Sequence, residues 1–129
     1  MIFISYGKED RSIAQGIRSI LEKEGYSVAM PEEQFLAGAS TDETVKASIT
    51  SSGLVVGLIT QANIGSAWVN QELGYAMATG VRTCLILGNG VNAGGLFSGS
   101  TNYIKINENN PGDAAISAST AIKSAISNR

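Results

Sequence analysis

The sequence of 129 residues predicts an α/β domain built on a mainly parallel β-sheet. Short apolar runs of strand type alternate along the chain with longer segments in which apolar residues recur at helical spacing. One run, 54–59, is apolar almost throughout, which is typical of a central parallel strand covered on both faces. A chain of this length can bury roughly two thirds of its extended surface, so we expect one domain over residues 1–129.

The first half of the chain predicts two strands, each followed by a helix. In order, we expect a strand at 1–5, a helix at 10–24, a strand at 26–30 and a helix from 40–43 onward. Asp10 is a candidate cap of the first helix, and Gly25 is well placed to end it. Pro31 opens a loop, and Ser40 begins a capping-box pattern at the next helix start.

The second half continues the alternation. We expect a strand at 54–59, a helix at 67–79, strands at 82–87 and 103–106, and a helix at 113–127. Ser66 suits the cap of the middle helix, and the Gly-, Asn- and Ser-rich residues 88–101 predict a long surface loop. The whole pattern favours a five-stranded sheet in the flavodoxin-like order 2-1-3-4-5. Ligands of such sheets bind outside the carboxyl ends of the strands.

Composition excludes several classes of function. With 43% hydrophobic residues, 16% charged residues and a net charge of −2, the chain resembles an ordinary globular protein, and we expect no nucleic-acid partner. The absence of histidine rules out imidazole acid–base catalysis, serine–histidine triads and histidine metal sites. We therefore expect no metal, and any catalysis would use carboxylates.

The single cysteine and the N-terminus add two expectations. Cys84 lies in an apolar run and is expected to pack as a small buried hydrophobe, with a reactive thiol as the alternative. The N-terminal apolar run is too short for a signal peptide, and no stretch is long enough to span a membrane. We expect a cytoplasmic protein with no membrane partner.

Glu72 breaks the pattern of the helix predicted at 67–79. Successive helical residues lie about 100° apart, which places Glu72 within one apolar arc, roughly 40° from Trp68 and from Ala76. A carboxylate on a core-facing position is unfavourable unless it has a function. The alternative is that Glu72 lies at the margin of this face and turns out to water.

Three segments together carry a family resemblance. They are Ile2-Phe3-Ile4-Ser5-Tyr6 with the following Asp10, the loop Pro31–Ala39 with Gly38, and Ser66-Ala67-Trp68-Val69-Asn70-Gln71-Glu72-Leu73. Each motif is weak by itself, but their order on this scaffold resembles a TIR (Toll/interleukin-1 receptor) domain of the bacterial or archaeal NAD-cleaving type. In such members a helix with the pattern W-x-x-x-E supplies the essential glutamate, and Trp68 and Glu72 match that spacing.

The resemblance implies an NAD⁺ glycohydrolase that releases nicotinamide and forms ADP-ribose or a cyclic isomer, in immune or anti-phage defence or signalling. NAD⁺ is then the substrate, and no cofactor is implied. Glu72 would be the catalytic residue. The substrate-binding residues would be Ser5, Tyr6, Gly7, Lys8, Asp10, Phe35, Leu36, Ser66 and Trp68. Lys8 and Arg11 are candidates for the pyrophosphate or are simply solvated, and Trp68 either faces the substrate or anchors its helix.

The resemblance also implies a protein partner. The Glu32–Ala39 loop corresponds to the family loop that packs against a neighbouring TIR domain, so homotypic self-association is expected. Phe35 and Leu36 in this loop either meet that neighbour or fold back onto their own domain. Two other functions stay open, a TIR–TIR scaffold without enzymatic activity and a mimic that binds host TIR adaptors.

Overall fold

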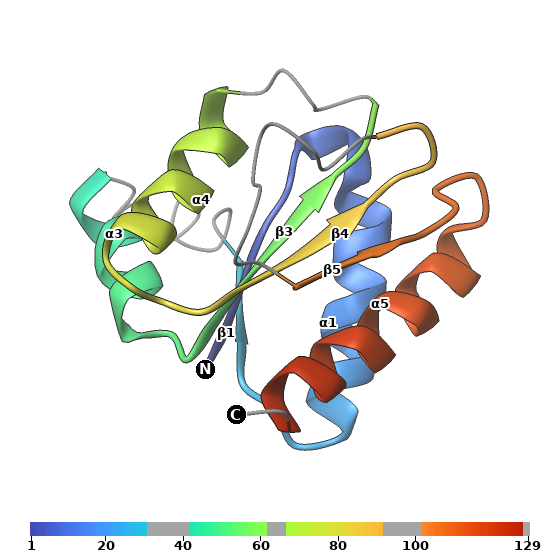
Figure 1. Ribbon diagram of the computed structural model, residues 1–129. Coiled ribbons are helices and arrows are strands. Elements are labelled where there is room, and N and C mark those ends of the chain that lie inside the picture. The colour runs from blue at the N-terminus through green and yellow to red at the C-terminus, as the bar shows by residue number, and fades with distance from the viewer. Residues whose placement is uncertain (31–41, 62–66, 92–101, 128–129) are drawn as a thin grey trace.

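A computed structural model describes residues 1–30, 42–61, 67–91 and 102–127, without the side chains of 42–45, 67–70 and 102. Five strands form one sheet in the order β2-β1-β3-β4-β5, and every neighbouring pair is parallel (Figure 1). The strands are β1 Ile2–Ser5, β2 Val28–Ala29, β3 Leu54–Ile59, β4 Thr83–Leu87 and β5 Asn102–Lys105. The predicted fold class and strand order are confirmed.

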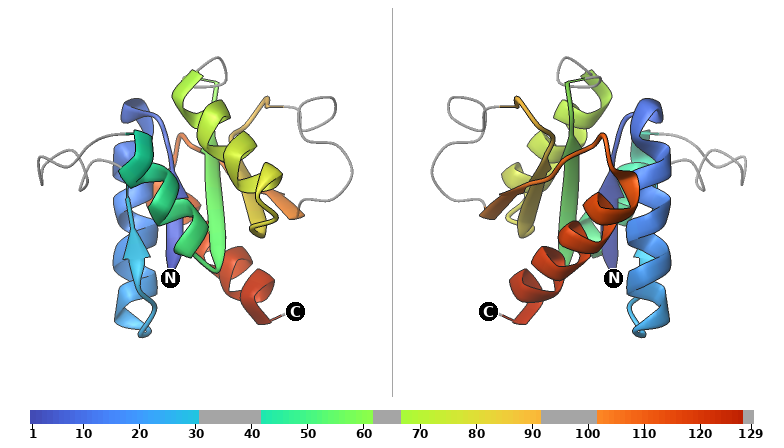
Figure 2. Two further views of the ribbon diagram at one scale, coloured as in Figure 1. Left: turned by 90° about the vertical axis from the view of Figure 1, so that its left-hand side faces the viewer. Right: turned by 90° about the vertical axis from the view of Figure 1, so that its right-hand side faces the viewer.

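Helices cover both faces of this sheet. They are η1 Lys8–Asp10, a 3₁₀ turn, and the α-helices α1 Arg11–Lys23, α3 Asp42–Ser51, α4 Ala67–Ala78 and α5 Pro111–Ser127. In Figure 1, α3 and α4 lie on one side of the strands and α1 and α5 on the other. Figure 2 shows the start of β1 and the end of α5 at the edge of the sheet opposite the strand exits.

Alternation along the strands divides the core between the two faces. Ile2 and Ile4 belong to the apolar cluster under α1 and α5, whereas Phe3 belongs to the cluster under α3 and α4. Successive strand residues point to opposite faces, so Ser5 follows Phe3 toward α4. All six residues of β3 are buried, as expected for the middle of a parallel sheet.

The end of α1 explains why β2 starts later than predicted. Gly25 has a φ of 95°, and the Tyr26 amide donates to the Leu21 carbonyl at 3.1 Å, so these residues close the helix as predicted for Gly25. Because the Tyr26 amide is used by the helix end, it cannot enter the sheet ladder. The strand predicted at 26–30 therefore starts later than predicted, and it is observed as Val28–Ala29.

The last helix begins two residues earlier than predicted, at Pro111. Proline suits the first helical position, because its missing N–H has no helical partner there. Asn110 accepts from the Asp113 amide at 3.4 Å and donates to the Asp113 carboxylate at 2.9 Å, which caps the start of α5.

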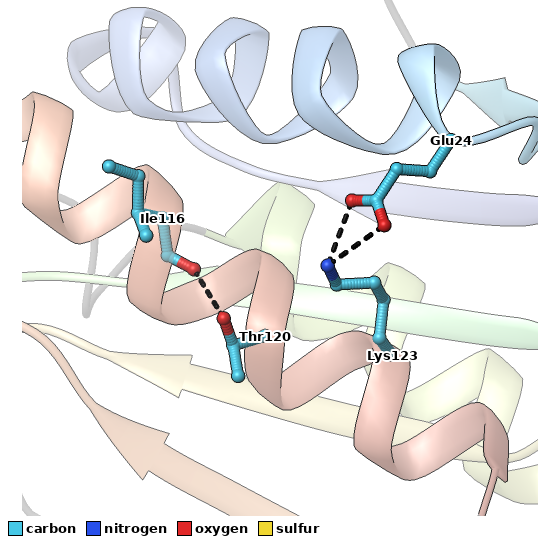
Figure 3. Close-up of polar contacts among 4 residues, drawn as sticks. All are labelled: Glu24, Ile116, Thr120 and Lys123. Carbon is cyan, nitrogen blue, oxygen red and sulfur yellow. Dashed lines mark hydrogen bonds and ion pairs between the residues drawn. The ribbon is translucent and has the colours of Figure 1, made fainter.

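On the outer surface, one ion pair joins the end of α1 to α5. The Lys123 ammonium donates to both oxygens of Glu24, at 3.0 and 2.8 Å (Figure 3). The two side chains are 33% and 43% exposed, Lys123 being the less exposed. Within the described residues, none of the helices has the length and apolar character that crossing a bilayer requires.

Candidate functional site

The candidate site lies where β1 and β3 end. These strands are neighbours, and Ser5 at the end of β1 is in register with Gly57 of β3. In parallel strands the carboxyl ends share one edge, so the segments that follow both strands meet there. The helix that follows β3 along the chain is α4, which contains Glu72.

Glu72 is buried against the end of β1. Its side chain is 4% exposed, and the Ser5 hydroxyl donates to Glu72 Oε1 at 2.5 Å. Leu73 and Ala76 on the same helical face are fully buried. The apolar face predicted around Glu72 is confirmed at Leu73 and Ala76, and the alternative in which the carboxylate turns out to water is wrong.

Burial changes the acidity of this carboxyl group. It raises the pKa of Glu72 from 4.5 to about 7, while the hydrogen bond from Ser5 opposes the rise. The acid and the carboxylate are therefore both populated near neutral pH. The second oxygen, Oε2, has no hydrogen-bond partner within the described part of the chain.

A second buried carboxylate, Asp10, lies just after β1. It is 6% exposed, and Thr60, the residue after β3, donates its hydroxyl to Asp10 Oδ2 at 2.7 Å. Burial raises the pKa of Asp10, the bond from Thr60 lowers it, and the charge of Glu9 raises it. Asp10 occupies the predicted cap position at the start of α1, but its side chain makes no cap hydrogen bond. Its carboxylate accepts from Thr60 instead.

These two contacts form crossed hydroxyl–carboxylate pairs, Ser5–Glu72 and Thr60–Asp10. In each pair the hydroxyl comes from the end of one strand, and the carboxylate comes from the segment or helix that follows the other strand. Hydrogen bonds to carboxylates are among the stronger ones in proteins. The crossed pairs thus tie the exits of β1 and β3 to each other on both faces of the sheet.

Neighbouring loops are tied to the same edge. The Gln61 side chain donates to the Gly90 carbonyl at 2.9 Å, which joins the segments after β3 and β4. The Asn89 amide donates to the Glu108 carboxylate at 3.0 Å, which adds the segment after β5. The edge that carries Glu72 is therefore braced from several strands.

The other predicted site residues differ in burial, and several of them lie outside the described residues. Tyr6 is 7% exposed and packs in the apolar cluster under α1 and α5, Gly7 is half-buried, and Lys8 is exposed. Trp68 lies in α4 one turn before Glu72, but its side chain is outside the described part. Phe35, Leu36, Ser66, the Glu32–Ala39 loop, the Ser40 cap and most of the loop predicted at 88–101 also lie outside the described residues.

Sequence reasoning missed Thr60 and Gly57. Thr60 lies at the end of an apolar run at the edge where ligands bind, which was the available signal. Gly57 interrupts that same run, and an isolated glycine in a strand often marks a close approach of another element. Both positions follow from the location of β3 rather than from any motif.

Two further observations concern metal and thiol groups among the described residues. Within the described ranges, no three His, Cys, Asp or Glu side chains lie close enough to hold a metal ion. Cys84 is buried, as predicted, and burial raises the pKa of its thiol to about 11. A thiol in this state stays protonated and unreactive at neutral pH.

Comparison with known proteins identifies a family. A family model described as a TIR domain matches residues 2–118. The match includes both crossed pairs and all five strands. A comparison with curated proteins finds no match.

Proposed function

Because the chain belongs to the TIR domain family, we propose that it is an NAD⁺ glycohydrolase that cleaves the bond between nicotinamide and ribose. The observation that carries this proposal is the buried Glu72 carboxylate, fixed by Ser5 at the strand edge where ligands of such sheets bind. We assign Glu72 as the catalytic residue. We assign substrate binding to Ser5, Tyr6, Gly7, Lys8, Asp10, Phe35, Leu36, Ser66 and Trp68.

The proposed reaction needs a fixed negative charge more than a proton donor. The bond between ribose C1′ and the nicotinamide nitrogen breaks, and its electron pair neutralises the cationic nicotinamide. A water oxygen then bonds to C1′ and releases a proton to solvent, or a nucleophile within the same molecule closes a ring. Because nicotinamide leaves without protonation, the lack of histidine is no obstacle.

Glu72 suits the transition state of this reaction. As C1′ becomes positively charged, an ionised carboxylate that accepts hydrogen bonds from the ribose hydroxyls stabilises it. Each such bond contributes roughly 1.5 to 3 kcal/mol, which is one to two orders of magnitude in rate when it forms only in the transition state. Oε2, which has no hydrogen-bond partner among the described residues, is the natural acceptor for one of them.

We further propose that self-association through the Glu32–Ala39 loop activates the enzyme, in the cytoplasm and in a defence or signalling role. This part rests on the family resemblance. A dependence of specific activity on protein concentration supports it, whereas constant specific activity across dilution contradicts it.

A scaffold without enzymatic activity is the competing function. The burial of Glu72 is compatible with a scaffold as well, because a carboxylate held by a neighbouring hydroxyl can serve packing alone. The two functions differ in one observable, which is release of nicotinamide.

The deciding experiment incubates purified protein with NAD⁺, at high concentration and with a crowding agent, and follows nicotinamide by chromatography. We expect release by the wild type and none above background by Glu72→Gln. Glu24→Gln is the matched control, because it makes the same chemical change at an exposed glutamate. No release by the folded wild type under any of these conditions would reject the enzyme and leave the scaffold.

A further inference from the structure

Gly57 leaves a space that α4 fills. It lies in β3 between Ser5 of β1 and Leu85 of β4. Because alternate strand residues share a face, Gly57 is on the same face as Val55 and Ile59, which is the α4 face of the sheet. A Cβ atom at this position would lie 2.6 and 2.7 Å from the two δ carbons of Leu73 and 3.1 Å from its γ carbon. Carbon atoms in van der Waals contact are about 3.5 to 4.0 Å apart, so no other residue fits without movement.

The residue that fills the space is the one next to Glu72. Leu73 is fully buried and packs with Phe3, Val55 and Leu85. Because its γ carbon is also too close to the added atom, rotating only the end of the side chain does not remove the clash. The easier response is a shift of α4 away from β3, by an amount on the order of 1 Å.

Such a shift acts directly on Glu72. The bond from Ser5 to Glu72 is 2.5 Å long, and Ser5 is on the strand that pairs with Gly57. A movement of α4 by that amount lengthens the bond and opens the carboxylate to water. The absence of a side chain at 57 therefore fixes how closely Glu72 approaches the end of β1.

We propose that Gly57 is a positioning residue that sets the depth of α4 on the sheet and so holds Glu72 against Ser5. Its effect on catalysis rests on the function proposed above, but its effect on the geometry of Glu72 does not. Gly57 touches neither substrate nor Glu72 in this role, because it acts through Leu73.

The test introduces a methyl group with Gly57→Ala and, as the matched control, Gly74→Ala. Gly74 is in α4 next to Leu73, and a Cβ there meets nothing within 4 Å. Circular dichroism and thermal melting first establish that each variant is folded. The carboxyl carbon of Glu72 is then titrated by ¹³C NMR, with its signal assigned from Glu72→Gln, and NAD⁺ turnover is measured in parallel.

We expect the Gly57→Ala titration midpoint to fall from about 7 toward the ordinary glutamate value, because burial is the main cause of the raised pKa. Turnover should fall on the order of 10- to 100-fold, as expected for a misplacement of about 1 Å. Gly74→Ala should keep both the midpoint and the turnover. A folded Gly57→Ala protein with the wild-type midpoint would overturn the proposal, whether or not the wild type cleaves NAD⁺.

Leu73→Val provides a rescue and covers the case in which Gly57→Ala does not fold. This change removes one carbon beside Gly57, so the double variant Gly57→Ala/Leu73→Val conserves the number of side-chain carbons. We expect the added methyl to stabilise Leu73→Val and to bring its Glu72 midpoint closer to the wild-type value. If the methyl instead destabilises Leu73→Val, or leaves its midpoint unchanged, α4 is not positioned by the space at Gly57.

Discussion

Glu72 in α4 and Glu24 at the end of α1 carry the same carboxyl group, but the fold surrounds them differently. Glu24 lies on the outer surface, 43% exposed, with both oxygens on the Lys123 ammonium (Figure 3). Glu72 is 4% exposed and receives one hydroxyl from Ser5. The exposed carboxylate has a full counter-charge, whereas no ion pair is found for the buried one among the described residues.

This difference shows where the fold tolerates the free-energy penalty of burying a carboxylate. An exposed ion pair contributes about 0–1 kcal/mol, because water solvates both charges almost as well. A buried carboxylate with one neutral donor is unfavourable, and its raised pKa measures that penalty. Penalties of this kind concentrate at functional sites, so the same residue type is structural at position 24 and a candidate for chemistry at position 72.

The largest expected effect is on turnover. We expect Glu72→Gln to lower NAD⁺ cleavage on the order of 10²-fold or more, because the amide cannot supply negative charge to the developing cation. Glu24→Gln should cleave NAD⁺ at the wild-type rate. Measured initial rates of nicotinamide release that fall equally in both variants would remove the distinction between the two glutamates.

The second expected effect is on stability. Folding raises the pKa of Glu72 from 4.5 to about 7. The contribution of Glu72 to the free energy of unfolding is therefore fully present below about pH 4.5 and is lost as the pH rises through 7. The loss is on the order of 3 kcal/mol. The raised pKa of Asp10 acts in the same direction.

Urea unfolding between about pH 5 and about pH 9 measures this loss. Glu72→Gln should lose less stability over the range and should be more stable than the wild type at its alkaline end. Glu24→Gln retains Glu72 and so should still show the loss. A wild-type stability that is flat over the range would mean that Glu72 is better solvated than its burial indicates.

A smaller effect on stability is expected when the Ser5 hydroxyl that donates to Glu72 is removed. Ser5→Ala deletes the hydrogen-bond donor to Glu72 Oε1. This deletion raises the pKa of Glu72 further and lowers the free energy of unfolding by roughly 1.5–3 kcal/mol. The pH profile of kcat/KM should therefore shift to higher pH. Ser119→Ala is the control, since the buried Ser119 hydroxyl has no partner within the described residues and its loss should cost nothing. Equal pH profiles of kcat/KM for both variants would show that the Ser5 hydroxyl does not stabilise the ionised form of Glu72.

The smallest effect belongs to the exposed pair. Lys123→Ala should change the free energy of unfolding by less than about 1 kcal/mol, and the difference should shrink as salt is added. Thermal or urea unfolding at low and high ionic strength checks this. A salt-independent loss of several kcal/mol in the free energy of unfolding would show that the exposed pair is not weak. The exposure of Glu24 would then not explain how it differs from Glu72.

Much of this contrast was predictable from local sequence. Helical spacing placed Glu72 on the buried face of its helix, next to Leu73 and Ala76. The apolar run of β3 placed that helix at the edge where ligands of such sheets generally bind. Gly25 was correctly predicted to end α1, since a single glycine with positive φ is a local signal.

The contacts that define the site were not predictable in the same way. Ser5 and Glu72 are 67 residues apart, and Asp10 and Thr60 are 50 apart, so no periodicity relates them. Asp10 was assigned to a helix cap because capping is the usual local use of aspartate before a helix. Its actual partner depends on the pairing of β1 with β3, which only the assembled sheet provides.

The crossed pairs also have a consequence for a chain emerging from the ribosome. Neither pair can form within one strand–helix unit, because Ser5 has no acceptor until Glu72 has been synthesised and β1 has paired with β3. Contacts between distant residues form late, since the intervening chain must first be closed into a loop. A nascent or partly unfolded molecule would thus hold an ordinary, hydrated glutamate, and the proposed chemistry would begin only when the centre of the sheet is complete.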